Sequence, residues 1–219
     1  MRVLITGSSG LIGSALRERL AAEGHHYESL RRGPTWDPES GRIDPQAVEG
    51  FDAVVHLAGA GIGDHRWTAA HKRRVLDSRV NGTGALARAL AGGNDAPRVM
   101  VSSSAVGYYG NRGDEVLTED SGPGDDFLSE VCKGWEQATR PAEEAGVRVV
   151  RLRTGIVFSG KGGALKPVLR LARLGLAGRL GSGRQYWSWI SIEDEVAAVM
   201  FALANEELAG AVNATAPTR

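Results

Sequence analysis

The stretch Val3-Leu4-Ile5-Thr6-Gly7-Ser8-Ser9-Gly10-Leu11-Ile12-Gly13 decides the fold class of this chain. A short β-branched, apolar run is followed by a turn with glycine at every third position, and then by apolar residues at helical spacing. A strand, a tight glycine turn and a helix in this order are typical of the first unit of a parallel α/β sheet.

The glycines of this turn point to a phosphate site. The first permits a tight bend, the second lets the backbone approach a pyrophosphate, and the third lets helix and strand pack closely. The helix N-terminus adds free N–H groups and a partial positive charge. The pattern predicts a dinucleotide held by Gly7, Ser9, Gly10, Leu11, Ile12 and Gly13, and the alternative is a plain strand-to-helix turn.

The residues at the end of the next expected strand, 27–30, bear on which dinucleotide is bound. NAD sites usually carry an acidic residue about 20 residues after the glycine turn, where it binds the ribose 2′-hydroxyl. This sequence has Arg31 and Arg32 there instead. Guanidinium groups bind phosphate bidentately, so the pair favours NADP and its 2′-phosphate. A solvated basic turn is the alternative reading, and Glu28 lies nearby.

The rest of the chain continues the alternation of strands and helices. We expect strands at 52–57, 98–101 and 147–152, helices at 67–90, 127–145, 165–176 and 193–204, and a loop at 33–50, which holds three prolines. This pattern predicts a single Rossmann-like domain over 1–219, a doubly wound parallel sheet. Residues 159–192 are expected to contribute to a C-terminal substrate lobe. Because the sequence ends soon after 211–213, that lobe is small or the chain stops early.

Composition excludes several classes of protein. The 219 residues include 26 Lys and Arg and 26 Asp and Glu, and this neutral balance argues against a nucleic-acid partner. Cys132 is the one cysteine, so no internal disulfide can form, and the histidine spacing suggests no metal site. The longest apolar run, 196–204, is far shorter than the ~20 residues of a membrane span. We expect a soluble, cytoplasmic protein without a membrane partner.

Several motifs together resemble the extended short-chain dehydrogenase/reductases. They are Thr6–Gly13, His56-Leu57-Ala58-Gly59-Ala60 and Ser102-Ser103-Ser104. Ser104–Gly110, Trp135-Glu136, Arg153–Val157 and Gly181–Gln185 resemble a narrower branch, the epimerase-like proteins of unassigned substrate, some of them labelled "cell division inhibitor". The resemblance implies a nicotinamide dinucleotide across the carboxyl edge of the sheet. The further contacts that it implies come from Leu57, Ala58, Gly59, Arg79, Ser102, Thr154, Gly155 and Val157.

The resemblance also implies a catalytic Ser–Tyr–Lys set, in which Ser104 holds the substrate oxygen and Lys133 is the helix lysine. Four residues before Lys133 stands Ser129, where the superfamily has its tyrosine. A serine hydroxyl is a far poorer acid than a phenol with a pKa of ~10. Tyr108 or Tyr109, after the serine strand, is the candidate phenol, and lining of the substrate pocket is the alternative for both.

Arg79 replaces the first residue of the Asn-Val-x-Gly-Thr pattern that is common in extended members. It is either a contact for an anion of the cofactor or substrate, or an ordinary arginine on the helix surface. These observations lead us to expect an NADP-dependent oxidoreductase or epimerase-like enzyme that acts on a carbonyl or hydroxyl carbon of a small molecule. A homodimer is the candidate assembly. A non-catalytic NADPH-binding sensor or regulatory protein is the alternative.

Overall fold

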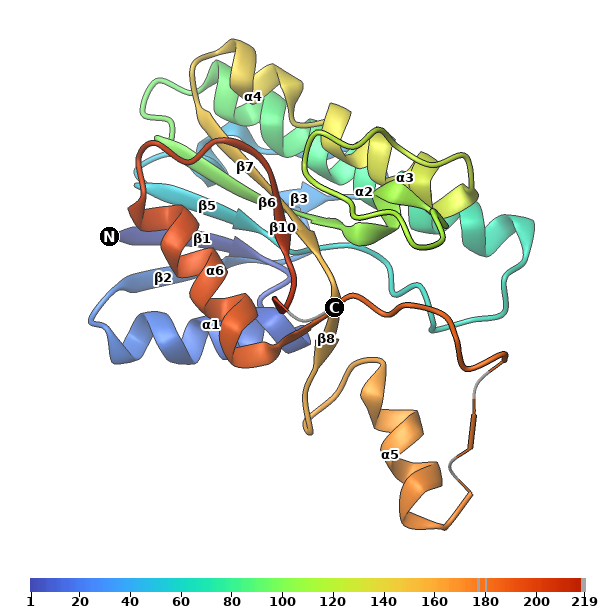
Figure 1. The fold of residues 1–219 in the computed structure, drawn as a ribbon. Coiled ribbons are helices and arrows are strands. Elements are labelled where there is room, and N and C mark those ends of the chain that lie inside the picture. The colour runs from blue at the N-terminus through green and yellow to red at the C-terminus, as the bar shows by residue number, and fades with distance from the viewer. Residues whose placement is uncertain (177, 180, 218–219) are drawn as a thin grey trace.

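A six-stranded, all-parallel sheet forms the centre of the molecule. The structure, a computed structural model, describes residues 1–176, 178–179 and 181–217. The strand order is β10-β7-β6-β5-β1-β2 (Figure 1). The strands are β1 (Arg2–Thr6), β2 (His26–Leu30), β5 (Ala53–His56), β6 (Val99–Ala105), β7 (Arg148–Thr154) and β10 (Gly210–Ala214). The chain leaves β1 to one side for β2 and to the other for β5. In such sheets, ligands bind at this switch point.

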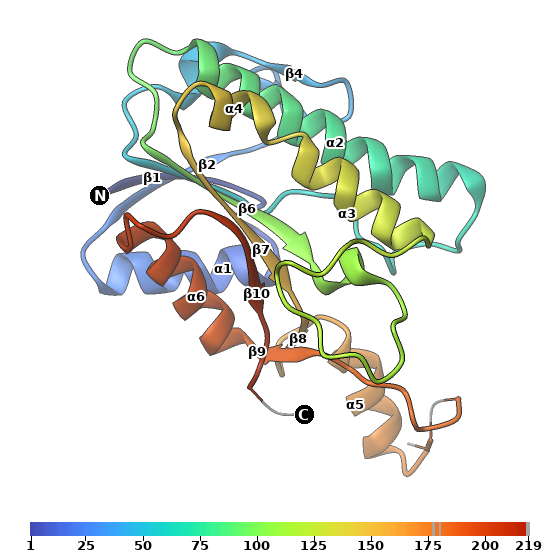
Figure 2. The same cartoon turned by 45° about the horizontal axis from the view of Figure 1, so that its top comes forward.

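Helices cover both faces of the sheet, which confirms the predicted doubly wound fold. The helix α1 (Leu11–Ala22) lies with α6 (Ile192–Ala204) on one face. The helices α2 (Ala69–Gly92), α3 (Phe127–Gln137) and α4 (Arg140–Glu144) cover the other (Figures 1 and 2). Side chains alternate between two apolar cores: Val3 and Ile5 pack beneath α1 and α6, and Leu4 packs on the opposite side.

The helix expected at 127–145 is in fact two helices, α3 and α4. Pro141 stands in the first turn of α4. Its ring has no N–H and would clash with the carbonyl of the residue four positions earlier, so one continuous helix is excluded. The expected loop 33–50 also holds short regular elements: η1 (Pro45–Val48) and a hairpin of β3 (Trp36–Asp37) and β4 (Arg42–Ile43).

The segment after β7 stands apart from the sheet. The strands β8 (Ile156–Phe158) and β9 (Trp189–Ser191) pair in parallel, and α5 (Leu165–Arg173), which has no buried residue, projects away from the sheet (Figure 1). This segment includes residues 159–192, which stay the predicted contribution to a substrate lobe; positions 177 and 180 lie outside the described residues. Within the described ranges, no helix is long and apolar enough to cross a membrane.

Candidate active site

The glycine turn lies at the switch point of the sheet. Gly7 has a φ of +68°, and a Cβ on it would lie 2.7 Å from the carbonyl carbon of Leu57 and 2.8 Å from the amide nitrogen of Ala58. Gly13 is equally confined, because its Cβ would lie 2.4 Å from the Gly7 carbonyl oxygen. Gly10 caps α1 without a side-chain hydrogen bond, so the first N–H groups of the helix face the turn. This geometry is compatible with the predicted phosphate site.

A cavity of about 940 Å³ adjoins this turn. It is lined by Ser9, Gly10 and Leu11, by residues 158–163 and by the start of α6. Neither Ser104 nor Arg79 lines it. The cavity therefore reaches the phosphate end of the predicted cofactor site and not the expected reaction centre.

Arg31 and Arg32 follow β2 at the same edge of the sheet, and both are exposed. Arg32 forms ion pairs with Glu39 at 3.0 Å and with Asp37 at 3.5 Å. Arg31 has no hydrogen bond or ion pair within the described part of the chain. Of the two predicted phosphate ligands, Arg31 is therefore the more available.

Arg79 is buried, so it is not an ordinary arginine on the helix surface. Its Nη1 donates to the carbonyl oxygens of Ala60 at 2.9 Å and Val75 at 3.1 Å, and its guanidinium stacks on the ring of Trp135. A Cβ on Gly59 would lie 3.2 Å from the guanidinium carbon. Burial lowers the pKa of Arg79, and no carboxylate among the described residues pairs with it. A buried cation without an acidic partner favours an anionic ligand.

His56 ends β5 and is fully buried. Its ring nitrogens contact the hydroxyls of Thr6 at 2.7 Å and Thr83 at 2.9 Å. Burial, and then the charge of Arg79, lower the pKa of His56 to about 4. The ring is neutral and is held between these two hydroxyls.

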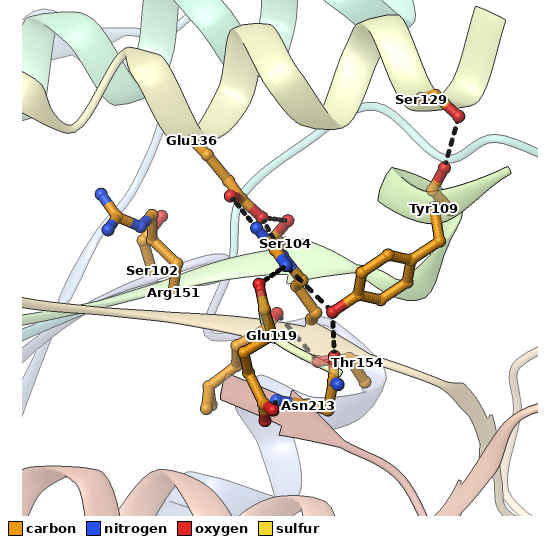
Figure 3. A network of polar contacts seen from close by, with 12 residues as sticks. Ser102, Ser104, Tyr109, Glu119, Ser129, Glu136, Arg151, Thr154 and Asn213 are labelled. Carbon is orange, nitrogen blue, oxygen red and sulfur yellow. Dashed lines mark hydrogen bonds and ion pairs between the residues drawn. The ribbon is translucent and has the colours of Figure 1, made fainter. Parts of the chain in front are cut away.

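Ser104, Arg153 and Asn213 form a row across three neighbouring strands, because β6, β7 and β10 place them in register. Arg153 binds Glu136 of α3 with two parallel contacts, Nε to Oε1 and Nη2 to Oε2, each of 2.9 Å. The Ser104 hydroxyl donates to Oε1 of the same carboxylate at 2.7 Å. Burial alone lowers the pKa of Arg153, but its hydrogen bonds to Glu136 and Tyr109 outweigh this effect and raise it. Figure 3 shows Ser104, Glu136 and Asn213 converging at this point.

Both predicted tyrosines lie against Arg153. The Tyr109 hydroxyl accepts from Nη1 of Arg153 at 2.9 Å and donates to Oδ1 of Asn213 at 2.6 Å, so this buried phenol is fully used within the protein. The Tyr108 ring lies 3.6 Å from the guanidinium carbon of Arg153. Tyr108 is half-buried, and its hydroxyl has no hydrogen bond within the described ranges. The structure therefore brings Ser104, Tyr108 and Tyr109 together.

Lys133 does not join this group. It is exposed on α3, whereas Ser129 is buried and donates to the carbonyl oxygen of Gly107 at 3.0 Å. The α3 residues nearest to a Cβ on Gly107, which lies in the 3₁₀ turn η2 (Val106–Tyr109) after β6, are Leu128 and Cys132. On this helix Ser104 contacts Glu136 and not Lys133. The catalytic role of Lys133 stays a prediction. Burial, and then Glu136, raise the pKa of Cys132 to about 11, so its thiol is neutral.

The NAD dependent epimerase/dehydratase family matches residues 3–214 of the chain. The chain belongs to this family. An epimerase family protein of Mycobacterium tuberculosis is 49% identical over an alignment of 222 positions, which covers 98% of this chain and 73% of that protein.

Two solved structures of the epimerase family are similar over all of this chain. The human epimerase family protein SDR39U1 (isoform2), crystallised with NADPH, is 36% identical with a TM-score of 0.89, and 75% of it is covered. A nucleoside-diphosphate sugar epimerase from Corynebacterium glutamicum is 40% identical with a TM-score of 0.88. This chain spans 47% of the Corynebacterium chain.

Further predicted contacts of this epimerase-family chain lie on β6, at the end of β7 and after β7. Ser102 is buried on β6, and Val157 is half-buried on β8. A Cβ on Gly155 would lie 2.9 Å from the carbonyl oxygen of Ser188, so the turn after β7 packs closely against the residue that precedes β9. The Thr154 hydroxyl donates to Oε1 of Glu195 at 2.9 Å. No structural observation assigns a ligand to these residues, and their cofactor contacts stay a prediction.

Glu195 is fully buried on α6, and burial raises its pKa from 4.5 to about 7. Between these values the unfolded chain has lost the proton that the folded chain keeps. The free energy of unfolding therefore falls as pH rises from about 4.5 to 7, by up to roughly 3 kcal/mol. Glu195→Gln is expected to remove this loss, so its stability relative to the parent protein should rise between pH 5 and pH 8 in urea denaturation. The exposed Glu193→Gln is the control, and parallel pH profiles for the parent and Glu195→Gln would contradict the prediction.

Sequence reasoning missed Arg153, Asn213 and Glu136 as members of the site. One signal was present: Arg148, Arg151 and Arg153 interrupt an otherwise apolar strand. Charged residues in a strand that is covered on both faces require partners, and Arg151 and Arg153 find Glu143 and Glu136. The glutamates could not be assigned to these arginines without the packing of α3 and α4 on β7.

Proposed function

We propose that this chain binds NADP across the carboxyl edge of its sheet and catalyses hydride transfer at a carbon that bears oxygen in a small molecule. The observation that carries the proposal is the glycine turn at the switch point, at the same sheet edge as the polar row that holds Ser104. The bound cofactor would supply the hydride chemistry at C4 of its nicotinamide. The chain would supply the phosphate site, the buried cation Arg79 and the orientation of the substrate oxygen by Ser104.

Two observations support a nucleotide at this edge. The first N–H groups of α1 are not capped by a side chain, and Arg79 is a buried cation without a carboxylate among the described residues. Both features are compensated by a bound dinucleotide with its negatively charged phosphates. The human relative, 36% identical over the whole chain, was crystallised with NADPH.

The preference for NADP rests on Arg31 and Arg32. Replacing either with Ala is expected to weaken NADPH binding about 10- to 150-fold, since each charge-assisted contact contributes roughly 1.5–3 kcal/mol. Arg31→Ala should have the larger effect, because Arg32 already pairs with Glu39 and Asp37. NADH binding should change little in the same fluorescence titrations.

Arg140→Ala is the control for these titrations, since Arg140 is an exposed arginine that pairs with Glu144 on α4. Equal weakening of NADPH and NADH by Arg31→Ala would count against NADP as the cofactor. Turnover of alcohols or carbonyls that Ser104→Ala abolishes would support the enzyme.

A second candidate function is an NADPH-binding sensor without catalysis. The favouring observation is that Leu128 and Cys132 are the α3 residues that lie against Gly107, in the turn after β6, and neither side chain is a phenol or an amine. Tight NADPH binding without turnover across aldehydes, ketones, alcohols and sugar nucleotides would favour the sensor.

A further inference from the structure

We propose that Ser104 acts toward the ligand as a hydrogen-bond acceptor, fixed in that role by Glu136, and that the site therefore selects a hydroxyl group over a carbonyl group. The inference rests on the proposed function and adds the substrate class: an alcohol, bound together with the oxidised cofactor. It assigns Glu136 as a positioning residue for Ser104.

The direction of the Ser104 hydrogen bond is settled by its partner. Ser104 Oγ lies 2.7 Å from Oε1 of Glu136. An ionised carboxylate has no proton, so the serine must donate. A hydroxyl has one proton and two lone pairs, and within the described residues no group donates to Ser104. What Ser104 offers to a ligand is therefore a lone pair.

Glu136 is held as a carboxylate by Arg153. The two contacts of 2.9 Å pair each carboxylate oxygen with one guanidinium nitrogen, the bidentate geometry of strong arginine–carboxylate pairs. Their side chains are only 5% exposed for Arg153 and 11% for Glu136. Arg153 is fixed in turn by Tyr109 and by the carbonyl oxygen of Glu119. Rotation of Glu136 away from Ser104 would therefore break several buried contacts.

Other groups at this edge of the sheet cannot take over the role of Ser104. The Tyr109 hydroxyl donates its proton to Asn213, and the ring nitrogens of His56 are bonded to two threonine hydroxyls. Lys133 is exposed on α3. Among the candidate catalytic residues, Tyr108 has a hydroxyl with no hydrogen bond in the described part of the chain. Tyr108 is therefore the competing contact for the ligand oxygen, and the test has to separate it from Ser104.

Ser104 and Glu136 can also accept the proton of the ligand hydroxyl during oxidation. The C–H bond breaks and its hydride passes to NADP⁺, which becomes NADPH. The O–H proton passes to Ser104 Oγ while the serine proton passes to Oε1 of Glu136, and a C=O double bond forms. The proton then leaves Glu136 for water.

The test compares an alcohol with its matching ketone on the NADP⁺ complex, by ligand-observed NMR and NADPH absorbance. The probes are cyclohexanol with cyclohexanone and 2-propanol with acetone. We expect the parent protein to bind the alcohol about 10- to 100-fold more tightly than the ketone. The ketone oxygen and Ser104 Oγ would both be acceptors and could not form a hydrogen bond with each other. Glu136→Gln replaces one acceptor oxygen with an amide donor, and the preference should fall below threefold or reverse.

The matched control is Glu143→Gln, which alters the ion pair to Arg151 on the same strand and should keep the preference. Tyr108→Phe should also keep the preference for the alcohol. Loss of the preference in Tyr108→Phe would show that Tyr108, and not Ser104, contacts the ligand oxygen. Equal binding of alcohol and ketone, no binding of any probe, or an unchanged preference in Glu136→Gln would overturn the inference. NADPH titration of each variant checks the fold, and failure of the parent protein to bind NADPH would instead refute the proposed function.

Discussion

Arg153→Leu is expected to lower the free energy of unfolding by about 3–5 kcal/mol, the typical cost of removing one partner of a buried ion pair. Arg153 is 4% exposed, and its loss leaves the carboxylate of Glu136 without its cation. Tyr109 would lose its donor in the same step. Urea denaturation, followed by far-UV circular dichroism, measures the change.

Arg151→Leu is the matched control, since this arginine stands two residues earlier on β7 and also pairs with a glutamate. Its partner Glu143 has a 35% exposed side chain that water can solvate, so the loss should be about 1 kcal/mol or less. The double variant Arg153→Leu with Glu136→Leu should recover much of the stability, because no unpaired charge remains. Equal losses for Arg153→Leu and Arg151→Leu would show that the Glu136 pair has no special role.

The fold was predictable because its signals are local. The run from Val3 to Gly13 contains a strand, a turn and the start of a helix within a few residues, and each has its own pattern. The division of the expected 127–145 helix was also readable, since Pro141 lies inside it. A single helix over 127–145 is not compatible with a proline at this position.

The centre of the candidate site was not predictable in the same way. Ser104, Arg153 and Asn213 come from strands far apart in the sequence and meet only through the register of the sheet. Likewise, the side of α3 that faces β6 depends on how the helix packs. The sequence spacing of Ser129 and Lys133 shows that they share a helix face, but it does not show where that face points.

Arg79 illustrates the same limit for a single residue. Its position in a motif suggested either an anion contact or a surface arginine, and only the packing of α2 against Trp135 shows that it is buried. Burial changes what the residue can do, because an exposed arginine is solvated whereas a buried one requires a partner. The candidate site is therefore defined by charges that the fold has buried and by residues that no local pattern connects.

Gly13→Ala is expected to weaken NADPH binding by about 100-fold, which corresponds to one or two lost charge-assisted hydrogen bonds. A Cβ at this position would lie 2.4 Å from the Gly7 carbonyl oxygen and 2.8 Å from the Ser8 Cα. Both are backbone atoms, so the start of α1 has to move away from the turn, and its N–H groups move with it. Overpacking of this kind also costs about 1–3 kcal/mol of stability.

Gly92→Ala is the control for this change, because a Cβ there, at the end of α2, has no atom within 4 Å. It should bind NADPH like the parent protein and be as stable or slightly more stable, since alanine has less freedom than glycine in the unfolded chain. Fluorescence titration with NADPH and urea denaturation of the three proteins test both effects. Undiminished NADPH binding by a folded Gly13→Ala protein would mean that the phosphates do not lie against this turn, because a displaced helix start could not hold them.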